Sequence, residues 1–261
     1  MPVSTAGDIR YFAFDLFAGH HLKQAIFMRQ GGISPAPWDS LNTATSVGDS
    51  RENIIQNRAR IFEAAGRKVD SLYDVWQIHS NHVICTEAPR GLDTPPIKAD
   101  AIITDRPEVT LYMRFADCVP IFLYDPEHRV AGIVHAGWKG TVNKIAKDAV
   151  EAMHVRYKTD PSQVLAGIGP SIGPDHYEIG PDVKLLVDAA FQADAVQIIQ
   201  SADGLTKLDL WKANTLVLNE VGVKEIEAAG ICTACNTNDW FSHRAEHGKT
   251  GRFGAIFALE D

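Results

Sequence analysis

The fold of this chain is decided by one stretch, VTLYMRFADCVPIFLYDPEHRVAGIVH, which spans residues 109–135. Its apolar runs at 109–115, 120–124 and 130–135 are rich in β-branched and aromatic residues, and they predict three strands. The residues Asp-Pro-Glu-His at 125–128 favour a turn, so the last two strands should form a hairpin. Hairpins of this kind favour a mixed sheet over a strict alternation of parallel strands and helices.

Working outward, apolar residues recur at two-residue steps in some segments and at three-to-four-residue steps in others, which indicates both sheet and helix. The clearest helix follows Gly140, where apolar residues recur from Val142 to Met153. Another should run from about Ser50 to Ala65, with Asp49 or Ser50 as its N-cap. The fold class is therefore α/β (mixed α+β). The remaining predicted helices lie near 181–192 and 210–221, and the remaining strands at 11–17, 25–29, 73–79, 82–86, 101–104, 164–168, 226–231 and 252–259.

The composition bounds the class of protein. The chain has 261 residues, no linker or repeat divides it, and we expect a single domain over 1–261. A net charge of −8 argues against nucleic acid and anionic membranes as partners, because both attract cationic faces. No signal peptide or membrane span is predicted, and four cysteines are too few for a disulfide scaffold. We therefore expect a soluble, cytoplasmic monomer with free or metal-bound thiols.

Three residues could share a metal ion. His79, Cys118 and His135 each follow or end a predicted strand, where functional side chains are commonly placed. Three ligands leave a fourth tetrahedral position open, which distinguishes catalytic zinc sites from structural ones. The spacing of 39 and 17 residues matches no short zinc motif, however, and a single histidine or cysteine is more often structural. His82 is an alternative to His79. Residues three apart on a strand face opposite sides, so at most one of the two histidines can face a shared ion.

Several glycine-rich and basic segments could hold a phosphate. The turn Gly137-Trp138-Lys139-Gly140 lies between a predicted strand and a predicted helix, where backbone N–H groups can bind an anion. The alternative is that its glycines only permit a tight turn. The loop at 167–174 matches no nucleotide-binding fingerprint. Guanidinium groups suit phosphate, and the arginines in polar contexts are Arg29, Arg58, Arg244 and Arg252.

Cys232 and Cys235 suggest a zinc finger together with His243 and His247. Only seven residues separate Cys235 from His243, whereas a finger needs about twelve. We therefore expect no second structural metal here, and we expect the cysteines to cap a strand.

Taken together, these segments resemble the laccase-domain (YfiH-type, multicopper-oxidase-like) purine nucleoside phosphorylase family over nearly the whole chain. The resemblance implies a single-domain sandwich of mixed β-sheets flanked by helices, and it selects His79, Cys118 and His135 as the metal ligands. Two positions depart from the family pattern, namely His243 in place of tyrosine and Phe253 in place of methionine. The matching blocks are 29–34, 40–42, 47–49, 57–58, 77–79, 100–102, 116–120, 134–138, 167–170, 241–244 and 250–252.

The family resemblance also implies an activity. It implies phosphorolysis of adenosine, inosine and methylthioadenosine to a base and a ribose 1-phosphate type of product, with deamination of adenosine. Zinc is the expected cofactor, copper is an alternative, and the expected partners are a small-molecule nucleoside and phosphate. We assign proton transfer to Asp117, whose alternative role is to bond backbone amides at the strand end. Residues assigned to substrate or phosphate are Arg58, Asn42, Gly137, Lys139 and Arg244.

Three rival functions stay open at this stage. A copper-dependent polyphenol oxidase would need an axial methionine or many clustered histidines, and the ten histidines of this chain are scattered. A metal-free cysteine hydrolase would use Cys118 as nucleophile and His135 as base. A cell-wall editing or binding factor would show no phosphate-dependent release of a base.

Overall fold

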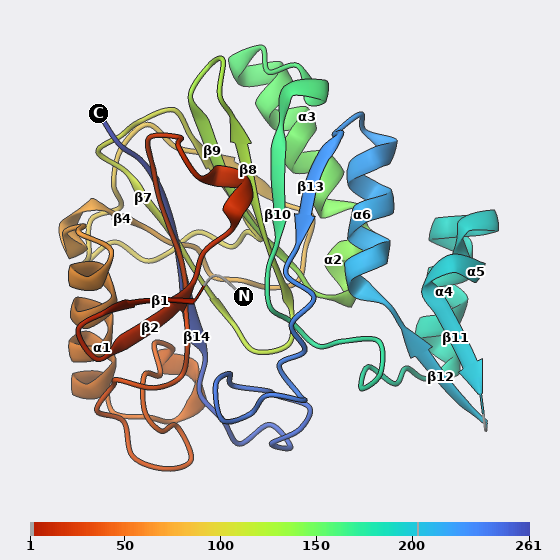
Figure 1. Cartoon of the computed structure of the whole chain (residues 1–261), viewed down its shortest axis with the longest axis horizontal. Helices are drawn as coiled ribbons and strands as arrows, with labels where there is room; N and C mark the ends of the chain where they lie inside the picture. Colours follow the sequence, from red (N-terminus) through yellow and green to blue (C-terminus); the bar gives the residue numbers. More distant parts are fainter. Residues whose placement is uncertain (1–2, 203) are drawn as a thin grey trace.

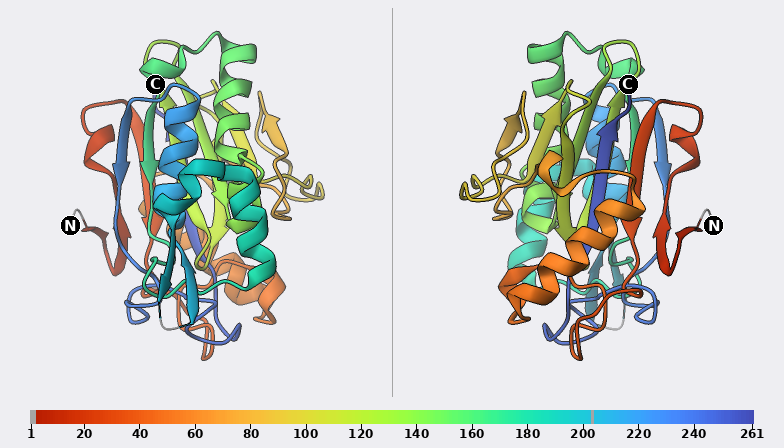
Figure 2. Two further views of the ribbon diagram at one scale, coloured as in Figure 1. Left: turned by 90° about the vertical axis from the view of Figure 1, so that its right-hand side faces the viewer. Right: turned by 90° about the vertical axis from the view of Figure 1, so that its left-hand side faces the viewer.

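Two six-stranded sheets pack face to face, and helices cover their outer faces (Figure 1, Figure 2). The computed structural model describes residues 3–202 and 204–261. The strands of the first sheet are, in spatial order, β1 (Val3–Ala6), β2 (Ile9–Phe12), β3 (Leu22–Phe27), β14 (Phe253–Leu259), β7 (Thr110–Phe115) and β4 (Leu72–Tyr73). Those of the second sheet are β13 (Glu225–Ala228), β10 (Leu165–Ile168), β8 (Val119–Asp125), β9 (Val130–Ala136), β6 (Ala101–Thr104) and β5 (Val83–Cys85).

The central stretch of the sequence forms three strands as predicted, but it divides them between the sheets. Strand β7 lies in the first sheet, whereas β8 and β9 form a hairpin in the second sheet. Residues 116–118 therefore carry the chain from one sheet to the other. Asp117 turns the chain there with a positive φ of 80°, and Cys118 follows it immediately.

Aromatic side chains fill the space between the sheets. The ring of Phe122 on β8 stacks against Phe257 on β14 at 4.7 Å and meets Phe14 edge-on at 5.7 Å. Every residue of β8 and β9 is buried, because one face meets the first sheet and the other meets helices. Burial on both faces explains why these strands are continuous apolar runs without alternation.

Helices close the outer faces of the sandwich. Helix α1 (Arg51–Ala64) covers the first sheet, and its N-cap is Ser50, whose hydroxyl accepts a hydrogen bond from Asn53 N–H at 3.2 Å. This result selects Ser50 from the two predicted caps. The helices that cover the second sheet are α2 (Trp138–Val142), α3 (Ile145–Tyr157), α4 (Pro181–Phe191), α5 (Ala195–Ile198) and α6 (Leu210–Glu220).

Several predicted boundaries were wrong. The strand predicted over 11–17 ends at Phe12. The strand predicted over 73–79 ends at Tyr73, because the buried carboxylate of Asp100, and not a neighbouring strand, accepts the N–H groups of residues 78–80. The helix predicted after Gly140 begins at Trp138 and is interrupted at Lys144, whose φ is 62°. Three short strands were missed because they bury few apolar side chains, namely β1, β11 (Ile199–Ala202) and β12 (Leu205–Leu208).

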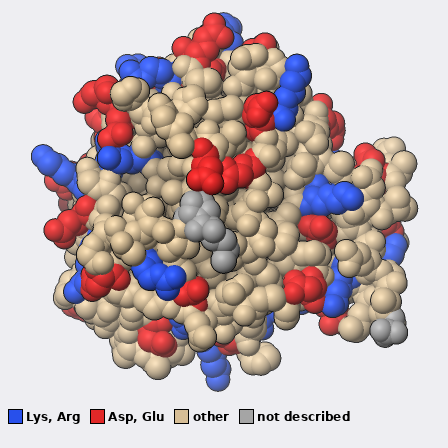
Figure 3. Space-filling view, viewed as in Figure 1, with Lys and Arg blue, Asp and Glu red and all other residues tan. Residues whose placement is uncertain are grey.

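The surface carries mixed charges. On the face shown in Figure 3, basic and acidic side chains are interspersed and no broad basic area forms, as expected from a net charge of −8. Among residues 3–202 and 204–261, no helix has both the length and the apolar character that a bilayer crossing requires.

Candidate metal centre

The structure brings His79, Cys118 and His135 together. One nitrogen or sulfur atom of each lies within 4.8 Å of the corresponding atoms of the other two. The sulfur of Cys118 is 3.7 Å from Nε2 of His79, and the two imidazole rings lie 4.9 Å apart. We call this group the three-residue centre. Residues far apart in the chain thus meet at one point, which is the arrangement that the family resemblance implied.

Each member of the three-residue centre comes from a different kind of segment. His135 is buried near the end of β9, where it pairs with Pro120 of β8. Cys118 is half-buried at the point where the chain enters the second sheet. His79 is exposed and lies on a loop with φ of 60°, a conformation that non-glycine residues rarely adopt.

The carboxylate of Asp100 holds two of these segments in place. It is fully buried, and it accepts a hydrogen bond from Nδ1 of His135 at 2.8 Å. It also accepts the backbone N–H groups of His79 at 3.0 Å and Ser80 at 2.6 Å, which fixes the loop in its rare conformation. Because Nδ1 of His135 is bonded to Asp100, its Nε2 is free to bind an ion. The sequence placed Asp100 in a matching segment but did not predict this role.

Charge within the centre favours a thiolate. Burial alone raises the pKa of the Cys118 thiol, but the neighbouring His135 and His79 outweigh it and lower that pKa to about 6. Burial lowers the pKa of His135, but Cys118 and Asp100 outweigh it and raise that pKa to about 9. Burial likewise opposes ionisation of Asp100, yet its bond to His135 helps to lower its pKa to about 2. At neutral pH the Cys118 sulfur is therefore a thiolate paired with a protonated His135, and the carboxylate of Asp100 stands behind that pair.

Gly137 lies directly against the centre. A Cβ atom at this position would stand 2.8 Å from Cδ2 of His79 and 2.9 Å from the sulfur of Cys118, both closer than side chains tolerate. The absence of a side chain therefore leaves room around these two groups. The helix that follows, α2, has only five residues, so its dipole offers little attraction for an anion.

The donor set suits a divalent ion of the zinc type. Two imidazole nitrogens and one thiolate are ligands that zinc binds in tetrahedral sites, with the remaining position available to water or substrate. A buried carboxylate behind a ligating histidine is the usual support of such sites. The residues present thus fit the metal that the sequence led us to expect.

Asp117 does not suit the proton transfer assigned to it. One of its carboxylate oxygens accepts the hydroxyl of Thr233 at 2.7 Å, and the other accepts the backbone N–H of Arg244 at 2.6 Å. The side chain is buried, and both oxygens are occupied. The structure thus favours the alternative role, in which Asp117 positions the segment beside Cys118.

Asn42 likewise does not face a substrate. Its side chain is fully buried, and its amide group donates to Ala44 O at 3.3 Å and to Asp49 at 2.9 Å. Its carbonyl oxygen accepts the backbone N–H of Arg252 at 2.9 Å. These bonds satisfy its polar atoms, so in this structure Asn42 supports the loop of Arg252.

Arg252 and His243 form a basic rim beside the centre. The guanidinium of Arg252 is half-buried, and burial lowers its pKa although the charges of Cys118 and Asp117 raise it. Nη2 of Arg252 donates to Nδ1 of His243 at 3.3 Å. Burial and the charge of Arg252 lower the pKa of His243, which favours a neutral ring with its proton on Nε2. The sequence had placed Arg252 only among four candidate arginines.

The other cations predicted to bind phosphate differ in availability. Lys139 is exposed next to Gly137, and its ammonium lies 5.6 Å from the ring centre of Trp138. Arg244 donates to Glu178 O at 2.9 Å and stacks over Tyr177 at 5.1 Å, so part of its guanidinium is engaged. Arg58 donates from Nε to Thr43 O at 3.1 Å, on the α1 side of the first sheet.

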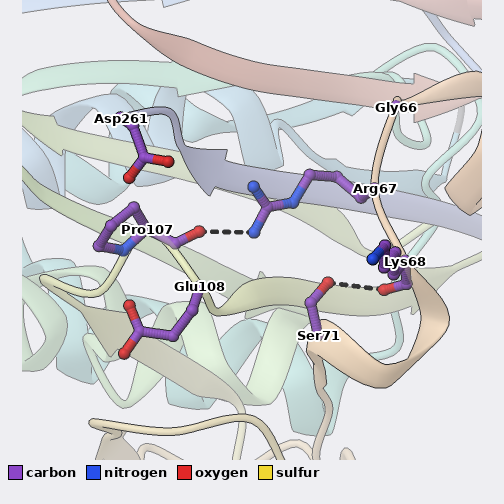
Figure 4. A pocket seen from close by; sticks show the side chains of 7 residues that line it. All are labelled: Gly66, Arg67, Lys68, Ser71, Pro107, Glu108 and Asp261. Atoms are coloured by element: carbon purple, nitrogen blue, oxygen red, sulfur yellow. Dashed lines mark hydrogen bonds between the residues drawn. The ribbon is translucent and has the colours of Figure 1, made fainter.

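A hollow elsewhere on the surface has no part in this centre (Figure 4). Pro107 and Glu108 line it and precede β7, whereas Cys118 follows β7, so the hollow lies at the opposite end of that strand. Arg67 is engaged there with Pro107 O at 2.6 Å and the Thr110 hydroxyl at 2.8 Å.

Comparison with known proteins gives a family and several relatives. Residues 23–260 match the family described as multi-copper polyphenol oxidoreductase laccase. The chain is 34% identical to the purine nucleoside phosphorylase YlmD of Bacillus subtilis over 89% of this chain and 87% of that protein. It is 36% identical to a purine nucleoside phosphorylase of Deinococcus radiodurans over 90% and 88% of the two chains.

Solved structures share the whole fold. The crystal structure of YlmD from Geobacillus stearothermophilus superposes with a TM-score of 0.93 at 29% identity, covering 99% of this chain and 98% of that one. The hypothetical protein YfiH of Bacillus licheniformis gives a TM-score of 0.92 at 29% identity, with 99% of each chain covered. These matches confirm the predicted mixed sandwich.

Proposed function

This chain belongs to the multi-copper polyphenol oxidoreductase laccase family, and from that premise we propose that it is a metal-dependent purine nucleoside phosphorylase. The observation that carries the proposal is the three-residue centre with a basic rim at its side. Relatives that align over nearly nine-tenths of the chain are named for this activity. Phosphorolysis requires phosphate held beneath the anomeric carbon and a stabilised leaving base, and the cationic rim and the metal-ligating centre would supply groups for both.

His79, Cys118 and His135 would hold the ion, and we propose zinc. A divalent ion with an open position supplies Lewis-acid chemistry that stabilises developing negative charge. The chain itself orients the ligands, since Asp100 fixes the ring of His135 and the loop of His79. The glycine at 137 keeps side chains away from the substrate face of the centre.

Phosphate would be held by Arg252, with Lys139 as a second cation. Arg252 lies within the field of Cys118, whereas Arg58 contacts Thr43 on another side of the sheet. The sequence analysis had assigned Arg58, and not Arg252, to substrate or phosphate. Holding the phosphate beneath the anomeric carbon lets it displace the purine in one step, with the bonding electrons leaving on the base.

His243 would stabilise the departing base. Because Arg252 donates to Nδ1, a neutral His243 ring carries its proton on Nε2 and can donate it to a purine nitrogen. A tyrosine at this position could donate a hydrogen bond in the same way, so the departure from the family pattern preserves a donor. The other departure, Phe253, is fully buried and packs on Trp240 at 5.1 Å, so it lies in the core and not in the pocket wall.

We further propose adenosine, inosine and methylthioadenosine as substrates, together with hydrolytic deamination of adenosine. Support for deamination comes from the three-ligand donor set, which leaves a position for water. Since both oxygens of Asp117 are occupied, His243 is the better candidate for moving protons.

The test is phosphate-dependent release of a base. Zinc-loaded protein is incubated with each nucleoside with and without phosphate, and base, ribose 1-phosphate and ammonia are measured. We expect His79→Ala to lower base release by roughly 10³-fold, since metal ligation is worth several kcal/mol. His82→Ala is the matched control, because His82 is an exposed neighbour whose ring bonds to Lys98 O at 2.9 Å. Equal activity in the two variants would remove the centre from the mechanism.

One specific observation favours a second candidate. The low pKa of Cys118 beside a protonated His135 is also the arrangement of a cysteine nucleophile. A metal-free hydrolase would be alkylated at Cys118 by iodoacetamide and would lose activity even when zinc is present. If the chain is a metal-dependent phosphorylase, bound zinc should protect Cys118 from alkylation.

A further inference from the structure

A second group of metal-ligating side chains lies outside the three-residue centre. Asp175, His176, Cys232 and Cys235 each offer one ligand atom, and these four atoms all lie within 4.8 Å of one another. We call this group the four-residue cluster. The sequence had paired the two cysteines with His243 and His247, and on their spacing had rejected a metal. In the structure their neighbours are Asp175 and His176, which precede them by more than fifty residues.

The four-residue cluster has the dimensions of a tetrahedral site. The sulfur of Cys235 lies 3.1 Å from Oδ2 of Asp175 and 3.4 Å from Nδ1 of His176. The sulfur of Cys232 lies 3.8 Å from the same nitrogen, which in turn is 2.9 Å from the Asp175 oxygen. Ligands bonded to zinc at their usual lengths stand about 3.3–3.8 Å apart. An ion could therefore enter with shifts of a few tenths of an ångström.

The surroundings support ligation over other roles. The backbone N–H of Gly173 donates to the sulfur of Cys232 at 3.2 Å, a bond that stabilises a thiolate. Both cysteines are free thiols, so no disulfide occupies the cluster. Thiolate and imidazole ligands favour zinc over magnesium or calcium, which prefer oxygen.

The cluster lies between two loops that leave neighbouring strands of the second sheet. Strands β10 and β13 are parallel, and the loops that follow their carboxyl ends carry His176 and Cys232 respectively. A single bridge between Ser171 and Cys232 continues the pairing before both chains leave the sheet. Beyond this bridge, the first loop carries Tyr177, which contacts Arg244 of the second loop.

We propose that Asp175, His176, Cys232 and Cys235 form a closed, four-ligand structural site for a zinc-type divalent cation. The cation joins the loop after β10 to the loop after β13, and it leaves no position for substrate because all four positions are protein ligands. The joined loops form the wall next to the three-residue centre, since Thr233 of the second loop donates to Asp117. The site is independent of the reaction assigned to that centre.

Zinc content distinguishes the two sites. Full-length protein is purified under reductant and loaded with Zn²⁺, unbound metal is removed, and zinc per chain is measured by elemental analysis. We expect about two equivalents for the unmodified protein and for Cys85→Ser, and about one for Cys118→Ala and for Cys235→Ser. Cys85 is the matched control, because it is an exposed cysteine outside both groups.

Cobalt provides a second readout that does not depend on activity. In Cys118→Ala the remaining Co²⁺ would have two thiolate ligands, and in Cys235→Ser it would have one. The thiolate-to-cobalt absorption per bound ion should therefore be about twice as strong in Cys118→Ala. Asp175→Asn, at an exposed position, supplies another variant that should fold and should lower zinc content to about one equivalent.

Two results would overturn the proposal. The first is a folded, fully reduced Cys118→Ala protein that binds no zinc, with folding checked by circular dichroism. The second is a disulfide between Cys232 and Cys235 that persists in protein kept under reductant with zinc present.

Discussion

The three-residue centre and the four-residue cluster differ in what lies behind their ligands. In the centre, His135 is on a buried strand and a buried carboxylate, Asp100, fixes both histidine segments. In the cluster, all four ligands are on loops, three of them are exposed, and a backbone N–H group donates to the sulfur of Cys232. A rigidly supported three-ligand site leaves one position of the ion open and suits catalysis. A four-ligand site with ligands from two loops suits a structural role, in which the ion joins the loops.

The largest expected difference is in catalysis. Cys118→Ala should lower kcat/KM for phosphorolysis by at least roughly 10³-fold, because it removes a ligand of the reacting centre. Cys235→Ser should lower it by less than about tenfold, since the cluster acts only through the wall of the site. Steady-state kinetics with saturating phosphate measures both. A loss of equal size in the two variants would contradict the division into a catalytic and a structural site.

The next difference is in metal affinity. Asp100→Asn should weaken zinc binding at the three-residue centre by about 10–100-fold, because the supporting carboxylate orients His135. The four-residue cluster should keep its affinity in the same protein. Competition with a chromophoric chelator resolves the two affinities, and Cys235→Ser as background isolates the centre. Unchanged affinity at the centre would show that Asp100 only anchors the loop.

The smallest effect concerns the hydrogen bond that joins the two regions. Thr233→Val removes the bond from Thr233 to Asp117 and should destabilise the fold by about 1–3 kcal/mol, while zinc content stays the same. Thr159→Val is the matched control, because the Thr159 hydroxyl is buried without a partner in the described part of the chain. Its free energy of unfolding should not fall. Denaturant unfolding of both variants measures the difference, and equal stability would mean that the two regions are not coupled through this bond.

Some of the fold and of the site could be read directly from residue order. The apolar runs of 109–135 predicted three strands, and the turn residues at 125–128 predicted their hairpin, because local side-chain pattern and turn chemistry act over short distances. The same local signals placed α1 and narrowed its N-cap to Asp49 or Ser50, of which the structure selects Ser50. The identity of the three-residue centre came from a family resemblance, since its spacing matched no short motif.

The tertiary structure alone decided the rest. Whether the hairpin and β7 share a sheet depends on how the chain turns at Asp117, and that turn is held by bonds from Thr233 and Arg244, more than one hundred residues away. The same distance hid the partners of Cys232 and Cys235. Sequence patterns report neighbours along the chain. The ligands of a metal site, and the carboxylate that supports them, come from segments that meet only when the sheets pack. For that reason the sequence determined the strands, and the packing determined what meets at their ends.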